Sequence, residues 1–412
     1  MATRPFPLRL SGDGPRCAGS TGSITGIVTA GRAIGARGRW GSHSNKEKGR
    51  FNVDNEIQDQ ADFAQNISIA ISRRKAFAMA AKLGLGSAAL AGGLGTGMAA
   101  NPPEAGGGLP KKNYKFVYVN HVTTNEFFTP TIYGIQDACA FFGCSYQWTG
   151  SQNSVVSEMV NAMQTAIAGK ADGIAVCLID ATAFDAPTAN ALAAGIPVIG
   201  YNADVPAGSP NKRLCYVGQP LYQSGYNIAT RWLKLVPKGG HVMLSIPSPG
   251  TLNLQPRLDG YVQAIKDQGS PVTYDVVNTS VDQATEISRI ESYYLSHKDV
   301  AGLFGTGGGD TYACGFVSAK YDLAKKGVIV AGYDLYPQTL GYIKAGDMTF
   351  TTDQQPYLQG FVPLLQMYLY KLSGGAVAPA DTNTSLAYVT KDNVDLYLGK
   401  SRFEGSTSAE PT

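Results

Sequence analysis

The 412-residue sequence lacks several patterns that mark enzymes, metal sites and nucleic-acid-binding proteins. It has no Cys-x-x-Cys pair, and its four histidines do not follow metal-ligand spacing. No zinc signature, P-loop or nucleophile elbow occurs. No long run of basic residues is present, although a phosphate backbone requires a concentrated positive surface. We therefore predict no metal, no cofactor, no catalytic residues and no nucleic-acid partner.

The charge that is present is unevenly distributed along the chain. Residues 1–100 carry 13 Lys and Arg against 6 Asp and Glu, whereas residues 101–412 carry 21 against 25. The second part is therefore mildly acidic. With 44% apolar residues, the chain has enough apolar material for sizeable cores. Its length suggests two or three domains.

Residues 71–100 have the features of an export signal. The pair Arg73-Arg74 precedes a stretch rich in Ala, Gly and Leu, and small residues follow at Ala99 and Ala100. Ser72 and the arginine pair resemble the start of a twin-arginine signal. The glycines and Lys82 make the stretch too polar for a stable membrane span. We interpret it as a cleaved signal of a periplasmic protein. The alternative is an amphipathic helix of the mature chain.

Three segments outside residues 114–398 are not expected to belong to the folded part of the chain. We interpret residues 1–70 as a disordered or mis-assigned N-terminal extension, residues 101–113 as a linker and residues 399–412 as a tail. Among the six cysteines, Cys177 and Cys215 lie in apolar runs and read as buried residues. Cys139 and Cys144 are close in sequence, and whether they pair is left open.

From residue 114 onward, short apolar runs alternate with helical patterns. Several runs, such as 173–179 and 327–333, are continuously apolar, which suits strands buried on both faces of a parallel sheet. The ten strand candidates are 115–122, 145–149, 173–179, 197–202, 214–217, 240–246, 272–278, 301–306, 327–333 and 348–352. The alternation predicts an α/β fold with two doubly wound, mainly parallel lobes. Ligands in such sheets bind beyond the carboxyl ends of the strands.

The residues at these strand ends suit a sugar. Adjacent aromatic residues in a polar turn can form a wall for a sugar ring, or they can belong to the core. Amide and carboxylate groups satisfy hydroxyls as donors and acceptors. Residues at or just after these strand ends include Asn125, Phe127, Phe128, Asn202, Gln255, Gly307, Asp334 and Gln354.

Four motifs along this stretch carry a family resemblance. They are Asn-x-Phe-Phe at 125–128, Ala-Gly-Ile-Pro-Val-Ile-Gly-Tyr-Asn at 194–202, Arg-Leu-Asp-Gly-Tyr at 257–261, and Val-Ala-Gly-Tyr-Asp at 330–334 followed by Thr-Thr-Asp-Gln-Gln-Pro at 351–356. Residues 114–398 resemble the periplasmic sugar-binding proteins of the ribose and galactose type, which serve ABC importers. The resemblance implies ligand-binding roles for the strand-end residues Asn125, Phe127, Phe128, Asn202, Gln255, Gly307, Asp334 and Gln354. Two positions at which ribose-type relatives have a ligand arginine appear here as Ala203 and Gln255.

The resemblance implies a type I periplasmic binding protein fold with a three-strand hinge. Lobe one would comprise 114–218 with 355–384, and lobe two 219–354 with 385–398. It implies a monomer that captures a neutral sugar or polyol and delivers it to a membrane permease. Arg257 is expected to pair within its own lobe, but a two-residue shift of the loop 247–256 would bring it into the pocket.

Two other functions compete with this interpretation. The sequence Gly305-Thr-Gly-Gly-Gly-Asp310 follows a strand and resembles a dinucleotide fingerprint, which would indicate an exported nicotinamide-dependent sugar oxidoreductase. However, Asp310 stands where the fingerprint requires glycine, and its carboxylate would repel a pyrophosphate. The second alternative is a sugar sensor for a membrane receptor.

Overall fold

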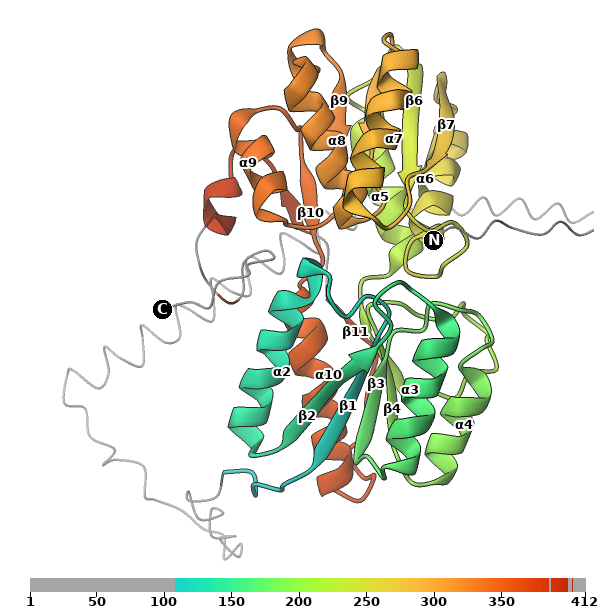
Figure 1. Ribbon diagram of the computed structural model, residues 1–412, viewed down its shortest axis with the longest axis vertical. Coiled ribbons are helices and arrows are strands. Elements are labelled where there is room, and N and C mark those ends of the chain that lie inside the picture. The colour runs from blue at the N-terminus through green and yellow to red at the C-terminus, as the bar shows by residue number, and fades with distance from the viewer. Residues whose placement is uncertain (1–107, 385–386, 399–401, 403–412) are drawn as a thin grey trace, which may run out of the picture. The chain divides into compact units, whose positions relative to one another are not determined.

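The computed structural model describes residues 108–384, 387–398 and 402 of the chain (Figure 1). The expectations for the N-terminal extension, the export signal and most of the linker fall on residues outside this range. Within it, strands and helices alternate and form two lobes, each built around its own parallel sheet. The predicted α/β fold of two mainly parallel lobes is confirmed. No helix of the described residues is long and apolar enough to cross a membrane.

Lobe one contains a six-stranded parallel sheet. In sheet order, its strands are β11 (Thr382–Asn383), β5 (Cys215–Gly218), β4 (Val198–Tyr201), β3 (Gly173–Val176), β1 (Lys115–Asn120) and β2 (Ser145–Gly150). Its helices are η1 (Glu126–Phe128), α2 (Thr129–Phe142), α3 (Val156–Ala168), α4 (Asp185–Ala193) and α10 (Pro356–Leu372). The helices α2 and α10 pack against each other on one face of the sheet (Figure 1).

Lobe two contains a four-stranded parallel sheet and a short antiparallel pair. The sheet order is β7 (Val272–Asn278), β6 (Gly240–Ile246), β8 (Gly302–Phe304) and β9 (Ile329–Ala331), and β10 (Thr351–Asp353) pairs with β12 (Ala387–Val389). Its helices are α5 (Leu221–Leu233), α6 (Gln255–Asp267), α7 (Gln283–Ser296), α8 (Gly308–Tyr321), α9 (Pro337–Ala345), η2 (Ala324–Lys326) and η3 (Val394–Tyr397).

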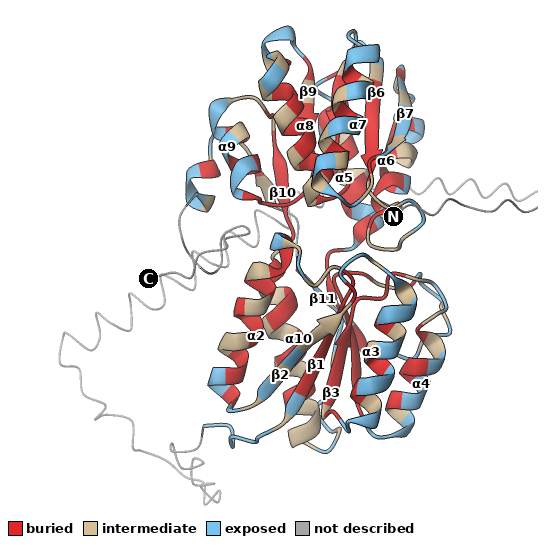
Figure 2. Cartoon of the chain, in the orientation of Figure 1, coloured by how far each residue is buried: buried red, intermediate tan, exposed pale blue. Residues whose placement is uncertain are grey.

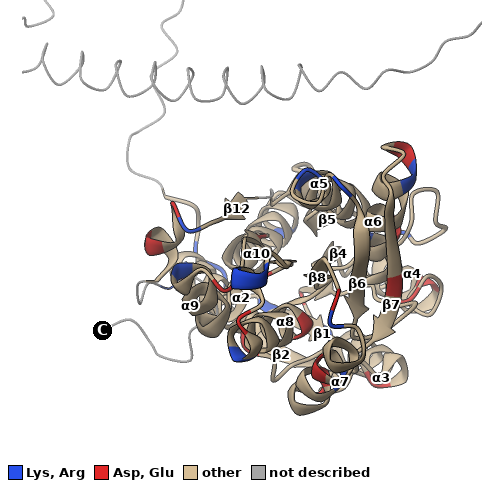
Figure 3. Ribbon diagram, turned by 90° about the horizontal axis from the view of Figure 1, so that it is seen from above, with Lys and Arg blue, Asp and Glu red and all other residues tan. Residues whose placement is uncertain are grey.

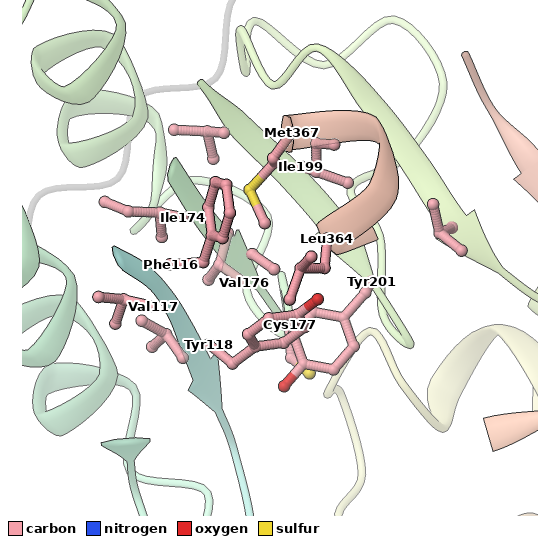
Figure 4. Packing of buried hydrophobic residues seen from close by; sticks show 14 of the residues in the cluster. Phe116, Val117, Tyr118, Ile174, Val176, Cys177, Ile199, Tyr201, Leu364 and Met367 are labelled. Atoms are coloured by element: carbon pink, nitrogen blue, oxygen red, sulfur yellow. The ribbon is translucent and has the colours of Figure 1, made fainter. Parts of the chain in front are cut away.

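The central strands are buried because helices cover both faces of each sheet (Figure 2). In lobe one, β1, β3 and β4 point apolar side chains toward α10, so that Phe116, Ile174 and Met367 share one cluster (Figure 4). In lobe two, Trp232 of α5 stacks on Phe304 of β8 with ring centroids 4.1 Å apart. The continuous apolar runs of the sequence therefore form the middle of each sheet.

The chain passes between the lobes three times. It leaves lobe one after β5, returns between β10 and α10, and leaves again between β11 and β12. In lobe two, a close helix contact positions the first turn of α6. A Cβ atom at Gly225 of α5 would lie 2.1 Å from the carbonyl oxygen of Arg257, so only glycine permits this approach.

Candidate functional site: a cleft between the two lobes

A cavity lies where the carboxyl ends of the strands of both lobes face each other. Its empty volume is about 810 Å³, including the mouth that opens to solvent, which is within the range of small-molecule sites. Lobe one contributes residues that follow β1 and β4, and lobe two contributes residues that follow β6, β7, β8 and β9. This is the position that the topology of parallel sheets predicts for a ligand.

An aromatic wall forms the lobe-one side. Phe127 and Phe128 both line the cavity, and their rings meet edge to face with centroids 4.7 Å apart. Both are also nearly buried, and Phe128 packs against Trp148 at 5.8 Å. The two functions that the sequence left as alternatives, cavity wall and core packing, are therefore combined in one pair of side chains.

Asn125 is positioned by the helix that follows it. Its Oδ1 atom accepts a hydrogen bond from the backbone N–H of Phe127 at 2.9 Å and so caps η1. The same oxygen accepts a second bond, of 2.7 Å, from the hydroxyl of Tyr336, which follows β9 in lobe two. Asn125 lines the cavity, and its oxygen already bridges the two lobes.

A chain of buried side-chain amides links three of the predicted site residues. Asn202 donates from Nδ2 to Oε1 of Gln359 at 3.0 Å, and Gln359 donates from Nε2 to Oε1 of Gln354 at 3.1 Å. Gln354 in turn donates from Nε2 to Oδ1 of Asp334 at 2.7 Å. We call these four residues the amide relay. Gln359 lies in the first turn of α10, where its Nε2 atom also donates to the backbone carbonyl of Gln354, and no sequence motif pointed to it.

Asp334 and Asn202 share an unusual backbone conformation. Their φ angles are 71° and 62°, in the left-handed region that asparagine and aspartate tolerate better than most residues. Asp334 is buried, and its burial raises the pKa of the carboxyl, while Arg257 and the bond from Gln354 lower it. Both residues line the cavity at the ends of their strands.

Arg257 pairs within its own lobe, as expected, and it also lines the cavity. Its guanidinium does pair locally: Nη1 donates to the carbonyl of Thr306 at 2.9 Å, and the group lies 3.8 Å from the ring centroid of Tyr333. However, its Nε atom is buried without a hydrogen-bond partner among the described residues. A basic group therefore faces the ligand space.

Gln255, a predicted ligand, is not among the residues that line the cavity. Its Oε1 atom accepts from the N–H of Gly250 at 2.9 Å, and its Nε2 atom donates to Asp259 at 2.8 Å. Gln255 and Arg257 are two residues apart at the start of α6, about 200° around the helix. Since they point to opposite sides, Arg257 faces the cavity and Gln255 faces away.

The glycine-rich turn after β8 is closed by its own aspartate. Asp310 accepts from the N–H groups of Thr306 and Gly307 at 2.9 and 2.8 Å, and from the Ser245 hydroxyl at 2.7 Å. Burial raises its pKa to about 6. The carboxyl occupies donors that a pyrophosphate would need, so the turn is not a dinucleotide site. Gly307 lines the sugar-sized cavity instead.

Three buried polar atoms of cavity residues lack a hydrogen-bond partner among the described residues: Nδ1 of His121, Oδ1 of Asn253 and Nε of Arg257. Burial lowers the pKa of His121 to about 3, so the ring is neutral. Its Nε2 atom lies 3.2 Å from Nδ2 of Asn253, across the two lobes. Buried polar groups are ordinarily paired, so these atoms indicate where ligand hydroxyls can bind.

Glu286 is a further cavity residue that the sequence did not single out. It lies in the first turn of α7, is only 2% exposed, and accepts from Nε2 of Gln283 at 3.1 Å. Burial, with help from the nearby carboxylates Asp310 and Asp282, raises its pKa to about 9. Glu286 is therefore a neutral acid near pH 7 and can donate a hydrogen bond. The helix α7 follows β7, and only the three-dimensional structure shows that Glu286 lines the cavity.

No group of three or more His, Cys, Asp or Glu residues in the described ranges could hold a metal ion. Charged residues of both signs are scattered over the described elements without a block of one sign (Figure 3). The polar groups of the cleft are thus mostly uncharged donors and acceptors beside an aromatic wall.

Residues 116–375 match the family described as "Periplasmic binding protein domain". The chain therefore belongs to the periplasmic binding protein family. Because this is a family of binding proteins, the prediction that the chain is not an enzyme is confirmed.

The chain is also similar to individual sugar-binding proteins. The chain is 44% identical over 373 residues to the xylose/arabinose-binding protein XylF of Sulfolobus acidocaldarius, a match that covers 83% of this chain and 92% of that protein. An ABC transporter solute-binding protein from Burkholderia graminis, in complex with D-arabinose, matches with a TM-score of 0.64 and 25% identity, over 70% of this chain and 99% of that one. The arabinose-binding protein AraP of Geobacillus stearothermophilus matches with a TM-score of 0.56 and 28% identity, over 69% and 99%.

Proposed function

We propose that this protein is the sugar-binding component of an ABC importer and that its ligand is a neutral pentose such as xylose or arabinose. The observation that carries the proposal is the cleft itself, in which an aromatic wall faces buried polar atoms that lack partners. Aromatic rings pack on the apolar face of a sugar, while amides and carboxyls bind its hydroxyls. The name of the relative XylF supplies the class of sugar.

The charges that line the cleft support an uncharged ligand. Arg257 contributes a positive charge, and it favours the ionised form of Asp334, while burial raises the pKa of that carboxyl. Glu286 is protonated near neutral pH because its pKa is raised to about 9. An anionic sugar would gain from Arg257 but would be repelled by Asp334 in a poorly solvated space.

The three crossings suggest how capture proceeds. Lobe one, with residues 114–218 and 355–384, and lobe two, with residues 219–354 and 385–398, would close on the ligand as a hinge. The closed form would then dock on the membrane permease. Small-angle scattering of the monomer should show a smaller radius of gyration at saturating sugar. An unchanged radius would contradict hinge closure.

Delivery to an importer requires the protein to act outside the membrane that the importer spans. The arginine pair Arg73-Arg74 and the small residues before Asn101 support export with a cleaved, twin-arginine-like signal. N-terminal sequencing of secreted or periplasmic material should give a start close to Ala100 or Asn101. A mature start upstream of Arg73 would contradict the signal.

Titration calorimetry tests the ligand class directly. Xylose and arabinose should bind at least about tenfold more tightly than myo-inositol, and more tightly than glucuronate or a pentose phosphate. If either acidic sugar bound more tightly than every neutral sugar, the charge argument would be wrong. If no sugar bound to a folded protein, the proposed function itself would fail.

A further inference from the structure

Two cysteines lie together away from the cleft, at the C-terminal end of α2. Gly143 ends this helix in the left-handed conformation, with φ of 70°. The N–H groups of Gly143 and Cys144 both donate to the carbonyl of Cys139, at 2.8 and 3.2 Å. The longer bond, from residue 144 back to residue 139, is typical of a Schellman motif, which brings the side chains of these two positions into contact.

The two thiols are also close enough to influence each other: the interaction raises the pKa of Cys139 and lowers that of Cys144. Cys139 is 8% exposed, and Cys144 is more accessible. The other described cysteines are buried and contact groups other than cysteine; the thiol of Cys215, for example, donates to Oε1 of Gln366 at 3.3 Å.

We propose that Cys139 and Cys144 form a disulfide across the C-terminal end of α2 when the protein meets a low-molecular-weight disulfide oxidant. The Schellman hydrogen bonds bring the two residues together at the helix end, where a disulfide needs its Cα atoms to be close. The bond would join the end of α2 to the start of β2. At its other end, α2 follows the turn that carries the aromatic wall of the cleft.

The disulfide would form by two successive thiol–disulfide exchange steps. The thiolate of Cys144, the more accessible sulfur, attacks oxidised glutathione and displaces one glutathione thiolate, leaving a mixed disulfide. Cys139 then releases its proton to solvent and attacks Sγ of Cys144, which displaces the second glutathione. The pair loses two electrons and two protons, and one glutathione disulfide becomes two thiols.

Peptide mapping of the full chain tests the pairing. The folded protein is incubated with oxidised glutathione, denatured without reductant in excess iodoacetamide, and digested with trypsin. We expect the peptide that contains Cys139 and Cys144 to be unalkylated and two hydrogen atoms lighter, and Cys177, Cys215 and Cys314 to be alkylated. Alkylation of both cysteines of the pair, their recovery only as glutathione adducts, or their pairing with other cysteines would overturn the proposal.

Variants separate this bond from general redox effects. In Cys144→Ser, Cys139 should become alkylated, whereas the matched control Cys215→Ser should keep the protected pair. Reductant should lower the thermal midpoint of the wild type and of Cys215→Ser by at least about 2 °C, and should leave Cys144→Ser unchanged. An equal response of all three proteins would show that the bond does not stabilise this helix end. The wild-type mapping remains decisive if a variant fails to fold.

Discussion

The two sides of the cleft differ in their chemistry. Lobe one contributes the rings of Phe127 and Phe128, the neutral imidazole of His121 and the amides of Asn125 and Asn202, none of which carries a charge. Lobe two contributes the carboxyl groups and the guanidinium of the cavity, namely those of Glu286, Asp334 and Arg257, and the phenol of Tyr336. Under the proposed function, lobe one would contact the flat face of a sugar and lobe two would bind its hydroxyls.

Removing the charge of lobe two should have the largest effect. Asp334→Asn keeps the side-chain size and tolerates the left-handed backbone, but it removes a carboxylate that can accept two hydroxyls. We expect xylose affinity to fall more than about tenfold, or about 1.4 kcal/mol, by titration calorimetry. Asp259→Asn, on the exposed side of α6, is the matched control. Near-wild-type binding by Asp334→Asn would place recognition elsewhere.

Weakening the aromatic wall should have an intermediate effect. Phe127→Ala removes apolar area that would cover a sugar ring, so we expect an affinity loss of about five- to tenfold. Phe127→Leu should lose less because it keeps part of that area. Circular dichroism of both variants checks that the fold persists, since Phe127 also packs in the core. Equal affinity of the alanine variant and the wild type would refute a wall function.

Replacing Glu286 should change how the stability of the protein depends on pH more than it changes the stability at any one pH. Its pKa is about 9 in the folded protein, well above the ordinary value of 4.5. Between these pH values the folded state binds more protons than the unfolded state, so stability falls as pH rises. Glu286→Gln should remove this contribution. The thermal midpoint of the variant minus that of the wild type should therefore increase as the pH rises from 5 to about 8.5. Asp353 titrates in both proteins, whereas Asp310 interacts with Glu286, so the difference reports Glu286 together with its effect on Asp310. Parallel curves would exclude the raised pKa.

The smallest effect is expected at Gln255. Its side chain bonds to Gly250 and Asp259 outside the cavity, so Gln255→Ala should change sugar affinity by less than about twofold. Titration calorimetry should compare this variant with Arg257→Lys, which should bind sugar more weakly because Arg257 lines the cavity. If Gln255→Ala weakened binding as strongly as Arg257→Lys, the placement of the α6 start would be wrong.

Sequence reasoning succeeded where strands are apolar and end in polar residues. All ten predicted strands correspond to β1 through β10, whereas β11 and β12, only two and three residues long, gave no apolar run. Seven of the eight candidate residues line the cavity, although their roles as ligands stay predictions. Arg257, Glu286 and Gln359 lie in the helices α6, α7 and α10, and strand ends do not point to them. The direction of each side chain depends on its position around the helix and on packing between segments far apart in the sequence.

The amide relay has a consequence for the entropy of binding. Asn202, Gln354 and Asp334 are held by hydrogen bonds to one another and to Gln359, and they lie beside the places where the chain crosses between lobes. Their rotamers are therefore fixed before a ligand arrives. A free side chain immobilised on binding costs about 0.5–1.5 kcal/mol, and this protein has met most of that cost during folding. The relay is therefore a preorganised set of contacts, on which the two lobes would close under the proposed function.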